Sequence, residues 1–352
     1  MKFSELKYFF LGAGILALGI LGFISRNTSP TTSATLTPPA SVTVEGERFE
    51  ADIQRLQEAL KATPGDQNNQ AELGRLYAMV GRFDEAQQIL EQSFSENPDH
   101  EKTLMQLGNL YRYRGRYADS EKMFLGVKLL APDRDDAYIE LGKLYRNWNK
   151  FDQAEAMFKK AISLNPNNDM TYSYGLGYLY RDMGQLEKSE AMFKKALEIN
   201  PENQFNYMGL GDIYRERGKY EESEKAFQEA IRRDPYSEAY MGMGFLYLYQ
   251  QRLDESEKAF QDYLRLIKPK AEVYNGLGQI YFLRKEYDKA EDAYRHSYEI
   301  NPTLDGGIGM ARVYIETGRS DQAPALVDAA LRLNPDDLQA KVVQQQLEQM
   351  HQ

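Results

Sequence analysis

The residue types that most often carry catalysis or bind metals are scarce in this chain. Its three histidines, His100, His296 and His351, are widely separated and fall in a predicted loop, a predicted helix and the C-terminal tail. Such spacing matches neither a zinc site nor a catalytic triad. Because the chain has no cysteine, thiolate nucleophiles, disulfides and cysteine-based metal sites are excluded. We therefore expect the histidines to face solvent or to pack within the fold.

Glycine pairs and carboxylates are abundant, but their context does not indicate an active site. Four Gly-x-Gly pairs lie inside predicted helices, whereas a dinucleotide site needs such glycines between a strand and a helix. The pairs are Gly175 and Gly177, Gly209 and Gly211, Gly242 and Gly244, and Gly276 and Gly278. Carboxylates such as Glu187 and Glu221 stand near lysines on predicted helices, which is typical of a solvated face. The sequence has no phosphate-binding loop, zinc-protease helix or nucleophile elbow, so we expect no enzyme, cofactor or metal.

The strongest pattern in the sequence is a repeat. A Leu-Gly pair, once replaced by Met-Gly, is followed three residues later by tyrosine and recurs at steps of 34, 34, 35, 34, 33 and 34 residues. The glycines are Gly74, Gly108, Gly142, Gly177, Gly211, Gly244 and Gly278, and the tyrosines are Tyr77, Tyr111, Tyr145, Tyr180, Tyr214, Tyr247 and Tyr281. An eighth copy keeps Tyr314 but has Ala311 at the glycine position. A period near 34 residues predicts one supersecondary unit stacked on copies of itself.

Each unit is predicted to contain two amphipathic helices. Alanine or serine, then phenylalanine and alanine, follow at spacings of four and three, as in Ala154, Phe158 and Ala161, and so share one face of a second helix. A polar turn that often carries glycine, such as Gly115 or Gly184, separates the two helices and suits a left-handed helix end. Asn-Pro or Asp-Pro then closes most units, because proline cannot continue a helix.

This pattern resembles the tetratricopeptide repeat family, whose signature has Leu-Gly and Tyr in its first helix, Ala, Phe and Ala in its second, and Pro at the end. The resemblance covers eight copies over residues 67–335 and implies an all-α, right-handed α-solenoid of helix-turn-helix repeats. The departures are mild: where the fourth position is aromatic, it is Tyr138, Tyr207, Tyr240 or Tyr274 and not tryptophan, and Lys268 stands where the sixth proline is expected. The last copy, with Gly306, Gly307 and Ala311, is the least typical.

Single helices are predicted on both sides of the repeats. Residues 47–66, which include Phe49, Ile53 and Leu56, are predicted to form a lone half-repeat helix. Residues 336–352 are predicted to form a glutamine-rich capping helix, because the end of a solenoid needs a polar outer face.

The N-terminal region is predicted to anchor the chain in a membrane. Tyr8 to Ile24 is a run of 17 mostly apolar residues with lysine before it and arginine after it. Residues 1–26 can therefore form a transmembrane helix whose apolar part is about 26 Å long, although a cleaved secretory signal is the alternative. The excess of positive charge before the run places Met1 in the cytoplasm and the repeats on the periplasmic or extracytoplasmic side. Residues 27–46, rich in Ser, Thr and Pro, are predicted to be a flexible linker.

The net charge limits the kinds of partner that the protein is expected to bind. The formal charge is −10 at pH 7 and the isoelectric point is near 5.1. Because a surface that binds nucleic acid needs an excess of lysine and arginine, we expect no nucleic acid as the main partner.

The family resemblance also implies which side chains would contact a partner. In this family the first helix of each repeat lines a concave groove, and here arginine occupies the twelfth position of four successive repeats. The candidate groove residues are Asn109, Arg112, Lys143, Arg146, Tyr174, Tyr178, Arg181, Met208, Arg215, Met241, Phe245, Tyr249 and Phe282. Arginine binds carboxylates through paired hydrogen bonds, and the aromatic and methionine side chains can accept apolar anchors. The expected partner is a protein or peptide segment, extended or helical, that is acidic at one end and apolar at the other.

Two features of this surface each have two interpretations. The glycines at the sixth position, Gly175, Gly209, Gly242 and Gly276, could leave pockets beside the aromatic residues or could allow close packing of helices. Likewise, the arginines could bind a partner or could simply pair with Asp136, Asp182, Asp212 or Glu216 of neighbouring helices.

Together these features predict a non-catalytic protein–protein interaction scaffold that is tethered to the membrane. It would bind a partner segment in its groove during the assembly of a membrane or envelope complex. The alternative is the same solenoid facing the cytoplasm, as a docking or assembly factor for a membrane complex.

Overall fold

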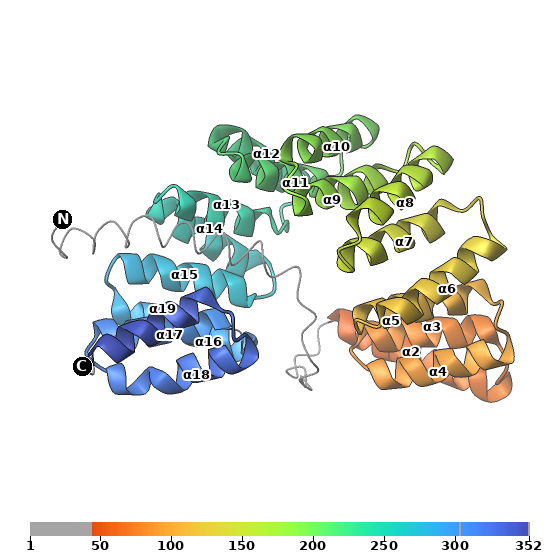
Figure 1. Ribbon diagram of the computed structural model, residues 1–352, viewed down its shortest axis with the longest axis horizontal. Helices are drawn as coiled ribbons and strands as arrows, with labels where there is room; N and C mark the ends of the chain where they lie inside the picture. Colours follow the sequence, from red (N-terminus) through yellow and green to blue (C-terminus); the bar gives the residue numbers. More distant parts are fainter. Residues whose placement is uncertain (1–43, 303, 351–352) are drawn as a thin grey trace. The chain divides into compact units, whose positions relative to one another are not determined.

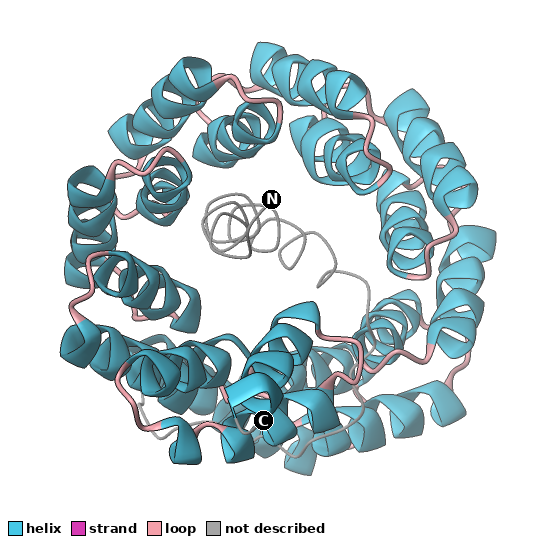
Figure 2. Cartoon of the chain, turned by 60° about the vertical axis from the view of Figure 1, so that its left-hand side comes forward, coloured by secondary structure: helices cyan, strands magenta, loops and turns pink. Residues whose placement is uncertain are grey.

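The structure, a computed structural model, describes residues 44–302 and 304–350, which are almost entirely helical (Figure 2). Short loops join the helices, and no strand occurs within the described ranges. The all-α helical repeat fold expected from the sequence is therefore confirmed. The predicted transmembrane helix, residues 1–26, and most of the predicted linker lie outside the described residues. Within 44–302 and 304–350, no helix is both long enough and apolar enough to span a membrane.

The described helices fall into two compact units (Figure 1). The N-terminal unit, residues 44–200, contains α2 (Val44–Ala62), α3 (Gln67–Met79), α4 (Phe83–Glu96), α5 (Glu101–Tyr113), α6 (Tyr117–Leu130), α7 (Asp135–Asn147), α8 (Phe151–Leu164), the π-helical η2 (Thr171–Gly177), α9 (Tyr178–Asp182) and α10 (Leu186–Ile199). The C-terminal unit begins at Pro201 and contains α11 (Gln204–Glu216), α12 (Tyr220–Arg233), α13 (Ala239–Tyr249), α14 (Leu253–Leu266), α15 (Ala271–Leu283), α16 (Tyr287–Ile300), α17 (Leu304–Glu316), the 3-10 turn η3 (Ser320–Gln322), α18 (Pro324–Leu333) and α19 (Leu338–Met350).

A glycine in the first helix of each typical repeat lets the second helix pack closely against it. A Cβ atom at Gly142 would lie only 2.6 Å from the ring of Phe158, and one at Gly211 would lie 2.6 Å from the ring of Phe227. Where the second helix carries serine, a hydrogen bond adds to this contact, as Ser223 Oγ donates to the carbonyl oxygen of Gly211 at 2.7 Å. These contacts explain why glycine, alanine or serine, and phenylalanine recur together.

The glycines at the sixth position also pack against phenylalanine, in this case from the preceding repeat. The distances from an added Cβ atom to the ring would be 2.8 Å for Gly175 and Phe158, 2.5 Å for Gly242 and Phe227, and 2.5 Å for Gly276 and Phe260. Each of these rings is thus held between a glycine of its own repeat and a glycine of the next, and each is at most 1% exposed. The prediction of pockets at these three glycines is wrong, because phenylalanine fills the space, and the close-packing interpretation is confirmed.

The eighth repeat packs in the same way, although its sequence is the least typical. A Cβ atom at Gly309 would lie 2.4 Å from the ring of Tyr294, and one at Gly306 would lie 2.8 Å from the carbonyl oxygen of the same tyrosine. Its second helix is divided into η3 and α18, and Pro324 begins α18, where a missing N–H is tolerated. The glycine-rich start of α17 therefore serves a close approach to α16.

The fourth repeat contains an irregular first helix. Residues Thr171–Gly177 form a π-helical segment that continues into the short helix α9. This segment coincides with the step of 35 residues between Gly142 and Gly177, one more than the usual period. A π-helical turn holds one extra residue within a helix, so the insertion is absorbed inside the helix and not in the preceding loop.

The turns between the two helices of a repeat adopt the left-handed conformation that the glycines predict. Gly115 has a φ of 71° and Gly184 has a φ of 70°, and Gly81, Gly218 and Gly318 are similar. In three repeats a different residue takes the same conformation, with φ values of 57° at Asn149, 58° at Gln251 and 61° at Lys285. The turn geometry is thus kept even where its usual residue is absent.

The flanking helices cover the two ends of the repeats. Helix α2 begins at Val44, slightly before the predicted range of 47–66, and packs on α3 through Ile53 and Leu56. Helix α19 buries Val343 and Leu347 against α17 and α18.

The first helices of neighbouring repeats contact one another in both units. In the N-terminal unit α3 contacts α5, α5 contacts α7, and α7 contacts η2; in the C-terminal unit α11, α13, α15 and α17 contact in succession. Direct contact of this kind is expected on the inner side of a curved stack of helix pairs. We call this side of each unit its first-helix surface.

Candidate partner-binding surface

The predicted site residues of α5 and α7 form a cluster of charges in the N-terminal unit. Arg112 Nη2 lies 3.0 Å from a carboxylate oxygen of Glu140 and donates to Asn109 Oδ1 at 2.8 Å. Lys143 Nζ lies 2.7 Å from the other oxygen of Glu140. Two cations thus share one carboxylate, which leaves this part of the first-helix surface with an excess of positive charge.

The next cluster combines a cation with two aromatic rings. Arg146 Nε lies 2.5 Å from Asp182, and its guanidinium carbon lies 5.6 Å from the centroid of the Tyr178 ring. Tyr178 meets Tyr174 edge to face at 5.1 Å. Arg146, Tyr174, Tyr178 and Arg181 are all partly buried. The π-helical segment of the fourth repeat carries Tyr174 into this cluster.

The predicted site residues of the C-terminal unit are mainly apolar and partly exposed. Phe245 packs edge to face on Phe260 at 5.0 Å, and Met241 lies in the same cluster. The sulfur of Met208 accepts a hydrogen bond from Ser237 at 3.3 Å. The remaining contacts are those of Tyr249 with Tyr220 at 5.4 Å, Phe282 with Tyr287 at 5.7 Å, and Arg215 with Asp212 at 2.9 Å.

The structure decides the question of pairing for three of the four predicted arginines. Arg146 pairs with Asp182 and Arg215 with Asp212, as the packing interpretation expects. Arg112 also pairs with an acid, but its partner is Glu140, which is not one of the expected acids. A ligand carboxylate at any of these positions would have to displace an existing ion pair.

Comparison with known proteins identifies the family. Models of the tetratricopeptide repeat match residues 46–94, 78–144, 135–168, 168–235 and 235–303, which is more than half of the chain. The chain belongs to the tetratricopeptide repeat family. Proteins of this family generally mediate protein–protein interactions. No curated protein sequence matches this chain.

Several solved structures share the fold. Yeast Tom70 has 16% sequence identity, with a TM-score of 0.65 over 95% of this chain and 72% of its own. The Cut9–Hcn1 hetero-tetramer of the APC/C has 15% identity, with a TM-score of 0.58 over 87% of this chain and 60% of its own. A tetratricopeptide repeat protein from Parabacteroides merdae has 19% identity, with a TM-score of 0.54 over 67% and 93%. At these identities the likeness concerns the fold alone.

The signature tyrosine of these tetratricopeptide repeats holds neighbouring repeats together and is not part of the first-helix surface site. In five repeats its hydroxyl donates to a glutamate of the preceding second helix: Tyr111 to Glu91, Tyr145 to Glu121, Tyr180 to Glu155, Tyr247 to Glu224 and Tyr281 to Glu257, at 2.7 to 2.9 Å. Burial and this hydrogen bond raise the pKa of Tyr111 to about 12. The recurrence suits a structural contact between tetratricopeptide repeats.

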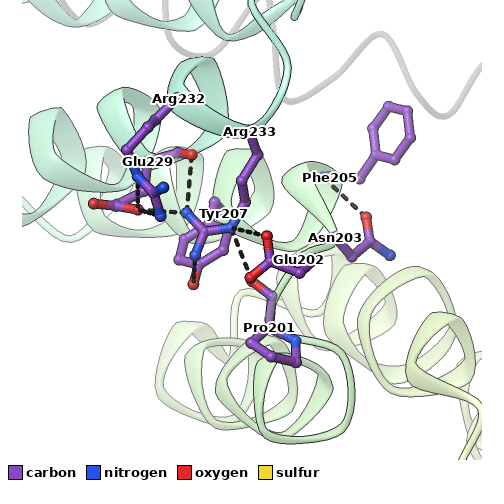
Figure 3. A network of polar contacts seen from close by, with 8 residues as sticks. All are labelled: Pro201, Glu202, Asn203, Phe205, Tyr207, Glu229, Arg232 and Arg233. Atoms are coloured by element: carbon purple, nitrogen blue, oxygen red, sulfur yellow. Dashed lines mark hydrogen bonds and ion pairs between the residues drawn. The ribbon is translucent and has the colours of Figure 1, made fainter.

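The first tetratricopeptide repeat of the C-terminal unit has an arginine that fixes its opening turn (Figure 3). Arg233 Nε donates to the carbonyl oxygen of Pro201 at 2.8 Å, and its Nη2 donates to the hydroxyl of Tyr207 at 2.8 Å. Its side chain, only 10% exposed, also pairs with Glu229. In the same turn, Asn203 caps α11 by accepting from the backbone N–H of Phe205 at 3.0 Å. These contacts hold the start of the helix that carries Met208.

Two of the three histidines of this tetratricopeptide repeat protein make local contacts, and the third, His351, lies outside the described residues. His100 Nδ1 lies 2.8 Å from Thr103 Oγ1, and burial lowers the pKa of His100. His296 stacks on Tyr274 at 5.1 Å. Within the described parts of the chain, no group of histidine, aspartate and glutamate side chains is arranged to bind a metal ion.

Sequence reasoning misses one residue of the first-helix surface. Arg312, at the ninth position of the eighth tetratricopeptide repeat, places its guanidinium carbon 4.6 Å from the centroid of the Phe282 ring. The arginine at the twelfth position recurs and so draws attention, whereas Arg312 occurs in the least typical repeat. The available signal was its position in the motif, which is one of those that face the groove in this family.

Proposed function

We propose that this chain is a non-catalytic scaffold whose first-helix surface binds a segment of a partner protein. The observation that supports this function is the series of partly exposed apolar side chains on successive first helices of the C-terminal unit. These are Met208 on α11, Met241 and Phe245 on α13, and Phe282 on α15. Methionine and aromatic side chains left partly exposed on adjacent helices are typical anchors for apolar residues of another chain.

The charges of the N-terminal unit favour a partner that also carries acidic residues. Arg112, Lys143 and Arg146 lie on the first helices of that unit, and the acids paired with these three cations are Glu140 and Asp182. This local excess of positive charge stands out in a chain whose net charge is −10. Such an excess attracts carboxylates and steers an acidic segment to this surface.

A photo-crosslinking residue tests the proposed surface in cells. Placed at Met241, on the first-helix surface, it is expected to give a discrete crosslinked product with a partner protein. The matched control places the same residue at Leu333, which is 64% exposed on the second helix α18. Products of the same kind and amount at both positions, or no product at Met241, would contradict binding at the first-helix surface.

The proposal includes tethering of the scaffold to a membrane. The apolar run from Tyr8 to Ile24 supports an anchor, and the charges around it support an extracytoplasmic position of the repeats during assembly of an envelope complex. The alternatives are a cytoplasm-facing assembly factor and secretion after cleavage of the run.

Protease treatment of intact spheroplasts with a tag at Gln352 separates these alternatives. Loss of the tag from membrane-bound protein indicates an extracytoplasmic scaffold. Protection until lysis indicates the cytoplasm-facing factor, and a tagged protein that is shortened and released from the membrane indicates secretion.

A further inference from the structure

A cation without an acidic partner lies on the first-helix surface of the C-terminal unit. Arg312, on α17, is partly buried, and its guanidinium carbon is 4.6 Å from the centroid of Phe282 on α15. In the described part of the chain no acidic side chain forms an ion pair with Arg312. Glu316, four residues later, is exposed and also makes no ion pair with it. Arg112, Arg146 and Arg215, in contrast, each contact a carboxylate.

The contact with Phe282 prepares this guanidinium for a ligand. The ring attracts the cation through its quadrupole and removes water from one face of the guanidinium. Phe282 is held in turn by Tyr287, whose ring meets it edge to face at 5.7 Å. Because the N–H groups of arginine point outward from the edge of the guanidinium plane, stacking leaves them available for a carboxylate. The orientation is therefore largely set before any ligand binds.

We propose that Arg312, stacked on Phe282, is the carboxylate-binding residue of the partner site. It accepts the side chain of an aspartate or glutamate within the partner segment, and an apolar residue near that acid packs on Met241 and Phe245 of α13. This inference rests on the proposed function, since it identifies the charged determinant of the same surface. With this assignment, the acidic residue and the apolar residue of the partner both bind the C-terminal unit. The acid is then not expected at the arginines of the N-terminal unit.

The advantage of Arg312 over the other arginines follows from their existing contacts. A ligand carboxylate that approaches Arg146 must first displace Asp182, so the new ion pair replaces an old one and little is gained. At Arg312 the incoming carboxylate displaces only water and forms charge-assisted hydrogen bonds.

A peptide-display experiment tests the assignment with the full-length chain. A library of random 12-residue peptides is selected on the wild-type chain and on the Arg312→Gln and Arg332→Gln variants. Arg332 is the matched control, because it is exposed on the second helix α18 of the same repeat, donates a hydrogen bond to the backbone carbonyl of Asp328 and forms no ion pair within the described residues. Both substitutions remove one positive charge. The affinity of the best wild-type peptide is then measured for each variant by fluorescence anisotropy.

We expect the wild-type chain and Arg332→Gln to select peptides with an acidic residue near an apolar residue. Arg312→Gln should select apolar residues without the acid, and it should bind the wild-type peptide about tenfold or more weakly. The wild-type affinity should also fall more steeply with salt than that of Arg312→Gln. Arg312→Lys, which keeps the charge but lacks the planar fork, should lose part of the affinity and is the second variant if Arg312→Gln is poorly folded.

The outcomes separate this inference from the proposed function. If the wild-type chain selects no peptide, the proposed binding function fails, and the inference fails with it. If the wild-type chain selects peptides but acid preference persists in Arg312→Gln, or falls equally in Arg332→Gln, the assignment of Arg312 alone is overturned.

Discussion

A phenylalanine ring held between two glycines leaves no room for a methyl group on either side. Phe260 shows this arrangement, with Gly244 of its own repeat on one side and Gly276 of the next repeat on the other. A glycine within a helix lowers helix stability by up to about 1 kcal/mol relative to alanine. Burial of the ring at close range offsets this cost, so the sixth-position glycines are explained by packing and need no ligand.

Replacing Gly276 with alanine should therefore destabilise the fold. The added Cβ atom would lie 2.5 Å from the Phe260 ring, which cannot retreat because Gly244 lies behind it. Overpacking of this kind costs about 1–3 kcal/mol, and the better helix propensity of alanine recovers up to about 1 kcal/mol. We expect a lower urea midpoint, followed by circular dichroism. Gly65→Ala is the control, because no atom lies within 4 Å of its added Cβ, and a midpoint for Gly276→Ala at or above that of the control would refute the packing argument.

The tyrosine hydroxyls predict how stability depends on alkaline pH. Burial and the hydrogen bond to Glu257 raise the pKa of Tyr281 from 10.0 to about 12. A raised pKa in the folded state means that this tyrosine contributes its full stability below pH 10 and loses that contribution as the pH rises through about 12.

Tyr281→Phe keeps the ring but removes the hydroxyl. We expect the variant to be less stable than the wild type at pH 8 and the difference to shrink between pH 10 and 12, measured as urea midpoints at each pH. A difference that stays constant over that range would mean that the hydroxyl does not titrate with folding. Tyr113→Phe is the control, because that ring is 74% exposed.

At the scale of elements, the first helix of the fourth repeat departs from regular α-helical geometry where the sequence departs from its usual period. Its helical stretch from residue 169 to residue 182 holds 14 residues, one more than the 13 of α5, α7 and α11, and Thr171 Oγ1 is buried there without a hydrogen-bond partner in the described residues. Removal of Ser173 from the sequence would place Tyr172 at the fourth position, where tyrosine stands in the third, fifth, sixth and seventh repeats. The π-helical segment is therefore the local consequence of a single inserted residue.

Deletion of Ser173 should convert this segment to a regular α-helix. Because π-helical turns are less favourable than α-helical ones, we expect a higher melting temperature and slower amide exchange over residues 171–178. Insertion of a serine after Tyr207, the equivalent place in the fifth repeat, should have the opposite effect. A lower melting temperature after the deletion would show that the surrounding repeats have adapted to the π-helical form.

The sequence alone was sufficient to predict the helices, but it was not sufficient to predict which charged side chains form pairs. The steps between Gly74 and Gly278 predict the helix pairs, because periodicity reports which residues face the core. Pairing is different: Arg112 pairs with Glu140 of the next repeat, whereas Arg312 stacks on a ring and forms no ion pair within the described residues. These contacts depend on side-chain positions that periodicity does not determine. The step of 35 residues was visible in the sequence, but whether a loop or a helix absorbs the extra residue depends on packing.

At the scale of the whole chain, the described residues form two compact units built from the same repeat. In a repeat protein each repeat contacts mainly its neighbours, so stability is approximately a sum of local terms. A substitution that destabilises one repeat should then have its largest effect in nearby repeats. The two units provide a direct comparison, since both contain a ring held between two glycines.

Gly142→Ala in the N-terminal unit and Gly276→Ala in the C-terminal unit form a matched pair for this comparison. An added Cβ atom would lie 2.6 Å from Phe158 in the first case and 2.5 Å from Phe260 in the second. We expect Gly142→Ala to accelerate amide hydrogen exchange mainly within residues 44–200, and Gly276→Ala to accelerate it mainly within residues 201–350, as measured by mass spectrometry of peptic fragments. We expect the two effects to stay in different units because, if each repeat is stabilised mainly by its neighbours, one unit can open without the other. Equal acceleration throughout the chain in both variants would show that the two units unfold together, and stability would then have to be assigned to the chain as a whole.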